Sequence, residues 1–103
     1  MATLRTIKAD NFEEVIGLSV LEGQKEFVAS NLYSLAQAKI YPECVPLAIY
    51  QDEDLVGFVM YAADPDDGEY WISRLMIDKK YQKRGYGKAA LKLVLSTIQS
   101  DKE

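Results

Sequence analysis

The feature that most constrains the fold is an apolar segment that passes through a short basic loop into a helix. Residues 75–77 read Leu-Met-Ile and are apolar on both faces, as expected for a central strand. A basic, glycine-containing loop follows. A helix is predicted over 85–100, because apolar residues recur there at i, i+3, i+4 and i+7. These residues are Leu91, Val94, Leu95 and Ile98.

The rest of the chain supplies further strands and two more helices. Asp10 or Asn11 suits the cap of a first helix, and a second helix is predicted over 24–40. Strands are predicted at four places, the last of which contains the apolar segment: 3–8, 47–51, 55–60 and 69–78. The expected order is β-α-α-β-β-β-α, an α/β (α+β mixed sheet) pattern in one domain, residues 1–103.

Composition is that of a globular protein. The chain has 103 residues, of which 49% are hydrophobic, and 12 Lys+Arg against 16 Asp+Glu give a net charge of −4. No apolar run reaches the about 20 residues that a membrane-spanning helix needs, and the first residues lack the apolar core of a signal peptide. We therefore expect a cytoplasmic protein without a membrane partner.

Cysteine and histidine usage excludes several kinds of site. Cys44 is the single cysteine and the chain has no histidine. An internal disulfide and metal sites built from His or Cys are therefore excluded, and no metal cofactor is expected. A histidine base and every His-dependent triad are excluded for the same reason.

Charge is unevenly distributed along the chain. Residues 43–69 contain eight acids and no base, whereas residues 79–92 contain six bases and no acid. Half of the bases of an acidic protein therefore gather in fourteen residues, which indicates an anion site. The alternative is an ordinary solvated helix start. A nucleic-acid partner is not expected, because proteins that bind a duplex show a broader basic footprint.

The glycines of the basic loop strengthen the anion interpretation. Gly85-Tyr86-Gly87 stands where the predicted helix begins, and helix N-termini present unpaired N–H groups and a positive dipole end. Glycine lets the backbone approach an anion closely, and Lys83, Arg84 and Lys88 add charge. Together these residues predict a pyrophosphate cradle built mainly from main chain. The loop matches neither the Walker A pattern nor the dinucleotide fingerprint.

The same segment resembles motif A of the GNAT superfamily of N-acetyltransferases. The match is Gln82-x-x-Gly85-x-Gly87 after a hydrophobic strand that ends in Ile77-Asp78. Residues 56–61 resemble the third strand of that family. A narrower pattern resembles bacterial spermine/spermidine (diamine) acetyltransferases and includes Glu22, Gln24, Phe27, Asn31, Ser34, Leu35 and residues 46–50. The resemblance covers essentially the whole chain.

The resemblance implies acetyl-CoA as co-substrate and a primary amine, favourably a polyamine, as acceptor. It implies that Leu75, Met76 and Ile77 line the pantetheine arm and the thioester, with one backbone N–H polarising the carbonyl. The pyrophosphate would be wrapped by the loop that follows, namely Gln82, Lys83, Arg84, Gly85, Tyr86, Gly87 and Lys88.

Deprotonation of the acceptor ammonium needs a base, for which a carboxylate acting through water is suited. Glu69, near the start of the last predicted strand, is the candidate, and a solvated turn residue is its plainer interpretation. Glu22, Glu26 and Glu43 are candidates for pairing with substrate ammonium groups, with exposed helix charges as the alternative.

The resemblance also implies elements that these 103 residues do not match. Members of the family continue into a fifth strand, a fourth helix and a final strand pair, and that helix supplies a tyrosine acid. We therefore expect an incomplete GNAT domain whose last strand has a free edge. Free apolar edges favour pairing with another chain, so a homodimer or higher homo-oligomer is expected.

Three functions remain open from the sequence. The first is an acetyl-CoA-dependent N-acetyltransferase. The second is a catalytically incomplete fragment or non-catalytic module that binds CoA, and the third is a small phosphate- or nucleotide-binding protein. The missing tyrosine favours the second over the first for this chain alone, and a requirement for the pantetheine arm would separate both from the third.

Overall fold

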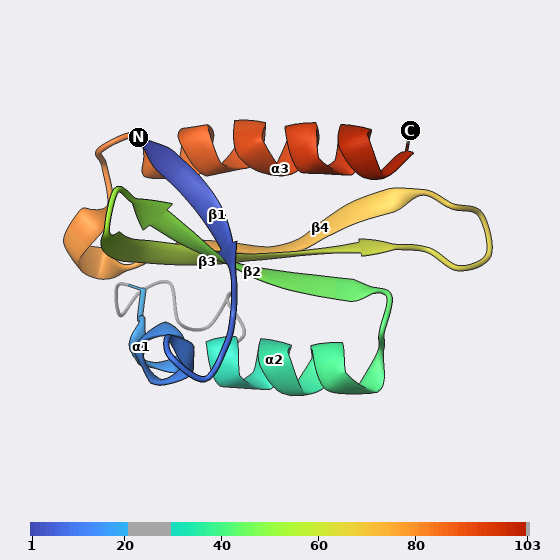
Figure 1. Ribbon diagram of the computed structural model, residues 1–103, viewed down its shortest axis with the longest axis horizontal. Coiled ribbons are helices and arrows are strands. Elements are labelled where there is room, and N and C mark those ends of the chain that lie inside the picture. The colour runs from blue at the N-terminus through green and yellow to red at the C-terminus, as the bar shows by residue number, and fades with distance from the viewer. Residues whose placement is uncertain (21–29, 103) are drawn as a thin grey trace.

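The fold is a four-stranded antiparallel sheet with helices on both faces. The computed structural model describes residues 1–20 and 30–102. Strands β1 (Ala2–Thr6), β2 (Cys44–Gln51), β3 (Asp54–Ala63) and β4 (Tyr70–Ile77) lie in the order β1-β2-β3-β4. Helices α1 (Phe12–Gly17) and α2 (Asn31–Ile40) cover one face, and α3 (Tyr86–Lys102) covers the other (Figure 1). The predicted fold class and element order are confirmed.

Side-chain alternation along the strands gives the sheet two cores, one on each face. The core under α1 and α2 is built from Ala48, Phe58, Met60 and Met76, with Val15 from α1. The core under α3 is built from Ile49, Val56, Val59, Ala90, Val94 and Ile98. Every residue of β3 from Leu55 to Tyr61 is buried, as expected of a strand covered on both faces.

The buried face of α3 differs from the predicted stripe. Val94 and Ile98 are buried as expected, but the third member of their row is Ala90. Leu91 and Leu95 are 39% and 54% exposed. The helix therefore packs along its i, i+4, i+8 row, and the apolar periodicity alone did not distinguish this row from its neighbour.

The polar residues near α1 and α2 serve purposes that the pattern did not predict. Asn11 precedes α1 but makes no side-chain cap, because its Oδ1 accepts the Lys8 N–H at 2.8 Å and its Nδ2 donates to the Thr6 carbonyl. It closes the turn between β1 and α1 instead. Ser30 caps α2 by accepting the Tyr33 N–H at 3.1 Å, so α2 begins at Asn31, seven residues after the start of the predicted range 24–40. Residues 24–29 of that range lie outside the described residues.

The buried face of α2 is partly polar. Asn31 and Ser34 are buried there, whereas Leu32 is 55% exposed. Asn31 Nδ2 donates to the Val15 carbonyl at 2.8 Å and lies 3.8 Å from the sulfur of Met76. A buried amide thus joins the end of α1, the start of α2 and strand β4.

Strands β3 and β4 approach closely near the end of β4. Gly57 faces Ile77 in the register, and a Cβ at Gly57 would collide with the Met76 carbonyl oxygen and stand 2.9 Å from Ile77 Cδ1. The position therefore accepts only glycine without a backbone shift. Within residues 1–20 and 30–102, no helix combines the length and apolar character needed to cross a bilayer.

Candidate functional site

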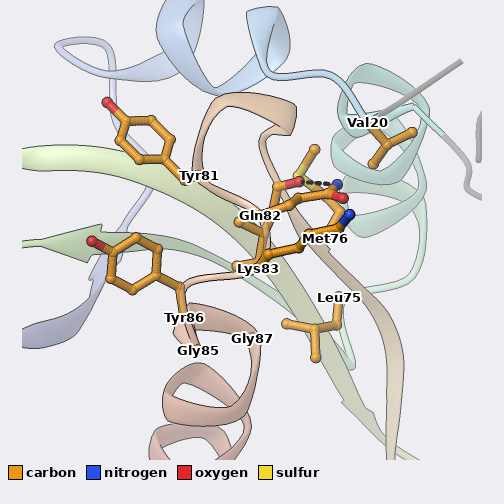
Figure 2. A pocket seen from close by; sticks show the side chains of 10 residues that line it. Val20, Leu75, Met76, Tyr81, Gln82, Lys83, Gly85, Tyr86 and Gly87 are labelled. Atoms are coloured by element: carbon orange, nitrogen blue, oxygen red, sulfur yellow. Dashed lines mark hydrogen bonds between the residues drawn. The ribbon is translucent and has the colours of Figure 1, made fainter.

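A cavity of about 450 Å³ lies where β4 passes into the loop before α3. This volume falls within the range of about 300–1,000 Å³ that is usual for small-molecule sites. Figure 2 shows its walls, which come from the end of β4, the 3₁₀ helix η2 (Lys79–Tyr81), the following loop and the first turn of α3. The lining residues are Val20, Leu75, Met76, Ile77, Tyr81, Gln82, Lys83, Gly85, Tyr86 and Gly87.

The loop reaches the helix through two residues with positive φ. Lys83 has φ 67° and Gly85 has φ 84°, a region that glycine enters freely and other residues rarely adopt. No atom would oppose a Cβ at Gly85, so glycine is needed there for its backbone conformation and not for space. The chain can therefore turn sharply and begin α3 at the cavity wall.

The start of α3 offers backbone donors to the cavity. Ala89 N donates to the Gly85 carbonyl at 3.1 Å, which is the first hydrogen bond of the helix. The N–H groups of Tyr86, Gly87 and Lys88 precede that bond, so the helix supplies no acceptor for them. Added to the positive end of the helix dipole, these donors favour an anion at this point.

The end of β4 presents backbone groups at the free edge. Asp78 N donates to the Val56 carbonyl at 2.8 Å, so Asp78 is turned toward β3. In an antiparallel pair the backbone N–H and C=O groups of successive residues point alternately toward and away from the partner strand. The backbone groups of Met76 therefore also face β3, and those of Leu75 and Ile77 face outward. The Ile77 carbonyl accordingly accepts from Gln82 Nε2 at 2.9 Å. An extended ligand can therefore hydrogen-bond to Leu75 along this edge, as an added strand does.

Cations and aromatic rings surround the loop. Lys83 lines the cavity, and the Arg84 guanidinium lies 5.7 Å from the centre of the Tyr81 ring. The rings of Tyr81 and Tyr86 lie 6.3 Å apart at an angle of 57°, side by side at one wall (Figure 2). The arrangement combines positive charge, main-chain donors and apolar surface, which suits an anionic head joined to an apolar or extended arm.

A scan against family models matches residues 6–101 to the acetyltransferase (GNAT) family. The chain belongs to the GNAT family. The match includes every residue of the cavity wall, so the cavity lies within the GNAT portion of the chain.

Two curated relatives are similar over most of this chain. A "Probable spermine N(1)-acetyltransferase" of Bacillus subtilis subsp. natto (strain BEST195) is 33% identical over 101 residues, and the spermine/spermidine N(1)-acetyltransferase of Bacillus subtilis (strain 168) is 32% identical over 101 residues. Both alignments cover 92% of this chain and 66% of the relative. The chain thus spans just under two thirds of the length of these GNAT relatives.

Solved GNAT structures share the fold. The ribosomal-protein-S18-alanine N-acetyltransferase of Escherichia coli superimposes with a TM-score of 0.70 at 15% identity, covering 98% of this chain and 61% of that one. The PaiA N-acetyltransferase of Thermoplasma acidophilum, solved in complex with coenzyme A, gives a TM-score of 0.67 at 13% identity, covering 98% and 74%.

The structure brings most of the predicted GNAT cofactor residues to one cavity. All of them line it except Arg84 and Lys88, which are exposed beside it. Val20 and Tyr81 were not predicted. Tyr81 stands inside the motif segment, so its position there was a usable signal, whereas Val20 lies 55 residues before Leu75 in the sequence and reaches the cavity only through folding.

The predicted acidic residues lie elsewhere. Glu69 is exposed in the turn before β4, and its carbonyl accepts the Asp64 N–H at 2.7 Å. Eight residues of extended chain, about 26 Å, separate Glu69 from Ile77, so Glu69 is not part of the cavity wall. Glu22 and Glu26 lie outside the described residues. Glu43 is partly buried just before β2, next to Cys44.

Cys44 does not have the environment of a reactive thiol. Burial raises the pKa of the Cys44 thiol, the charge of Glu43 raises it further, and only Arg74 opposes them. A nucleophilic cysteine needs a lowered pKa to exist as a thiolate near neutral pH. The surroundings of Cys44 therefore do not favour a thiolate near neutral pH.

Proposed function

We propose that this chain binds acetyl-CoA in the cavity beside β4 and takes part in transferring its acetyl group to a primary amine, a polyamine such as spermine or spermidine. The observation that carries the proposal is the meeting of two features in one cavity. One is the set of unpaired amides at the start of α3, and the other is the outward-facing backbone at the end of β4.

Each feature fits a different part of acetyl-CoA. The amides of Tyr86, Gly87 and Lys88 and the charge of Lys83 suit the pyrophosphate, because main-chain donors at a helix start stabilise phosphate oxygens. The outward backbone of Leu75 suits the extended pantetheine arm, which carries amide groups of its own. Leu75 and Ile77 are the two candidates for the backbone N–H that polarises the thioester, because the N–H of Met76 is turned toward β3.

The transfer is a single displacement in this proposal. The amine nitrogen forms a bond to the thioester carbon, the carbon–sulfur bond breaks, and the sulfur leaves as a thiolate that takes up a proton. The nitrogen must lose a proton because an ammonium has no lone pair. A backbone N–H of β4 directed at the carbonyl oxygen would stabilise the negative charge that develops there.

The base of this reaction stays a prediction. Glu69 is the candidate from the sequence. Its place at the far end of β4 is beyond the reach of one bridging water, so in this role it would act through a chain of several waters along the strand edge. Glu69→Gln tests the role, since loss of a general base lowers kcat by about 10²- to 10⁴-fold. Asp66→Asn, three residues away in the same exposed turn, is the matched control.

The polyamine preference is supported by the names of the two Bacillus relatives and by the acidic character of the chain. A net charge of −4 favours association with a polycation. Glu22, Glu26 and Glu43 remain the proposed partners of the substrate ammonium groups. Because the chain spans only part of its relatives, this substrate class belongs to the proposal.

Isothermal titration with acetyl-CoA tests the cofactor site, using Gly87→Glu and Gly87→Ala. Gly87 is preferable to Gly85, since φ 84° at Gly85 makes any side chain there strained. A Cβ at Gly87 meets only Ile77 Cγ1 at 3.8 Å, and glutamate in the first turn of a helix favours the helix dipole. Gly87→Glu should keep the fold and abolish binding, whereas Gly87→Ala should keep both.

A second step separates the candidate functions. Acetylation of spermidine by the wild type supports the transferase. Binding of acetyl-CoA without turnover supports a CoA-binding module. Equal affinity for 3′,5′-ADP and CoA would indicate a general phosphate-binding protein, because the pantetheine arm would then contribute nothing.

A further inference from the structure

We propose that Asp78 is a positioning residue. It holds the segment Leu18–Val20, which follows α1, against η2 and the loop that begins at Gln82, and it thereby closes the cavity. The inference rests on the proposed function for its role in acetyl-CoA binding, but its structural part is independent of any ligand. It assigns a task to a buried carboxylate that lies next to the cavity and does not line it.

Asp78 joins two segments that are distant in the sequence. Its Oδ1 accepts the Ser19 N–H at 2.9 Å, and its Oδ2 accepts the Lys80 N–H at 3.2 Å. The neighbouring Lys79 N–H donates back to the Ser19 carbonyl at 2.8 Å. Ser19 is therefore held through both of its backbone polar groups at the junction between β4 and η2.

The position of Ser19 affects the cavity through the next residue, Val20. Val20 follows Ser19 directly and is 8% exposed. Among the residues that the structure describes, it is the one lining residue from outside the segment Leu75–Gly87. Figure 2 shows Val20 beside Met76, on the other side of the cavity from Tyr81 and Tyr86. Fixing Ser19 at Asp78 fixes the start of that wall relative to η2, and the Lys80 contact fixes η2 relative to β4.

Only a carboxylate meets both donors. Asp78 is 5% exposed, so neither N–H can turn to bulk water without opening the site. A carboxylate carries two acceptor oxygens, whereas an asparagine amide carries one oxygen and one NH₂ group. In Asp78→Asn one of the two backbone donors would face another donor, although size and shape barely change. Asp78→Ala would leave both donors without their acceptor.

Amide hydrogen exchange of the ligand-free chain tests the structural part. Relative to the wild type, Asp78→Asn should raise exchange by about tenfold at Ser19 or Lys80, the donor that loses its acceptor, and at the loop amides of Gln82 to Gly87. Exchange at Tyr50 and Phe58, in β2 and β3, should stay unchanged. Asp54→Asn is the matched control, because Asp54 is an exposed carboxylate that lines the same surface hollow as Asp78.

The same variants titrated with acetyl-CoA test the functional part. Asp78→Asn should weaken binding by about tenfold, and Asp54→Asn should not change it. Unchanged exchange at Ser19, Lys80 and the loop in Asp78→Asn would overturn the inference. A uniform rise that includes Tyr50 and Phe58 would overturn it too, since it would mean a general loss of stability. If the wild type does not bind acetyl-CoA, the proposed function fails, and the exchange result still decides the role of Asp78.

Discussion

The side chain of Gln82 donates a hydrogen bond to the carbonyl of Ile77 over 2.9 Å, which ties the loop between η2 and α3 back to β4. The two residues enclose η2 between them. The residue that the family motif places at this position therefore acts on the protein's own backbone, and it sets where the loop begins its turn toward α3.

Replacing Gln82 should consequently loosen the loop. Gln82→Leu removes the donor while keeping the size, and we expect acetyl-CoA binding to weaken by roughly tenfold, since a net hydrogen bond is worth about 0.5–1.5 kcal/mol. Gln82→Arg restores N–H donors and should recover most of the affinity. Titration calorimetry measures both, and equal affinities for the leucine and arginine variants would contradict this account.

Gly57 should be the least tolerant glycine of the described residues to substitution by alanine. Its Cβ would collide with the Met76 carbonyl oxygen across the β3–β4 ladder. Overpacking costs about 1–3 kcal/mol, which corresponds to a fall in Tm of at least about 4 °C for a domain of this size. Gly17→Ala is the control, because nothing lies within 4 Å of its Cβ. A thermal melt in which both variants match the wild type would refute the close approach.

Asn31 should contribute more to stability than its polar neighbour Ser34. Asn31→Leu removes the shorter of two hydrogen bonds to the Val15 carbonyl, which then keeps only the Leu18 N–H at 3.3 Å, and we expect a loss of about 0.5–1.5 kcal/mol. Ser34→Ala should cost less, since the Ser34 hydroxyl donates to the Ser30 carbonyl, which already accepts the Ser34 N–H. Denaturant unfolding of the two variants measures the difference, and the reverse order would argue against the bridging role of Asn31.

Alkylation of Cys44 should need a higher pH than alkylation of a free cysteine. Burial raises the pKa of the thiol and Glu43 adds to the effect, so the thiolate fraction at pH 7.5 is below that of an exposed cysteine. Arg74→Gln removes the charge that lowers this pKa and should move the pH–rate profile further up, whereas Glu43→Gln should move it down. Iodoacetamide rates across pH 7–10 give the profile. A downward shift in Arg74→Gln or an upward shift in Glu43→Gln would contradict the cause.

We propose that β4 also mediates self-association through Tyr70–Arg74, the part of the strand that does not line the cavity. Among the described strands β4 lies at the edge of the sheet, and an edge strand favours pairing with another chain. Light scattering of the wild type should give twice the 11.6 kDa of one chain. Trp71→Lys, at an exposed position of β4, should shift the protein toward the monomer, since lysine on an edge strand opposes pairing. Leu95→Lys, on the exposed side of α3, is the control. A monomeric wild type would exclude the proposal.

The sequence predicted the parts of this protein that depend on local pattern. The strand at 69–78 became β4, the helix at 85–100 became α3, and the glycine loop reached the cavity because Gly85 must adopt positive φ. The sequence did not predict that Ala90, and not Leu91, would face the sheet. Both residues belong to apolar rows along the helix, and the periodicity does not say which row is buried. The tasks of Asn31 and Asp78 were also beyond the reach of the sequence, since each depends on a partner that only tertiary packing brings near.

The walls of the cavity differ in how far apart in the sequence their contacting residues lie. Of the ten lining residues that the structure describes, nine lie within Leu75–Gly87, so their mutual contacts are local. The tenth, Val20, depends on the bond between Ser19 and Asp78, which spans 59 positions. Local contacts form with a small entropy cost, whereas closing a loop of that length is slower. During folding the turn from Lys83 to Gly87 should therefore take shape before the pocket closes, and a chain interrupted between Ser19 and Asp78 would keep the turn and lose the pocket.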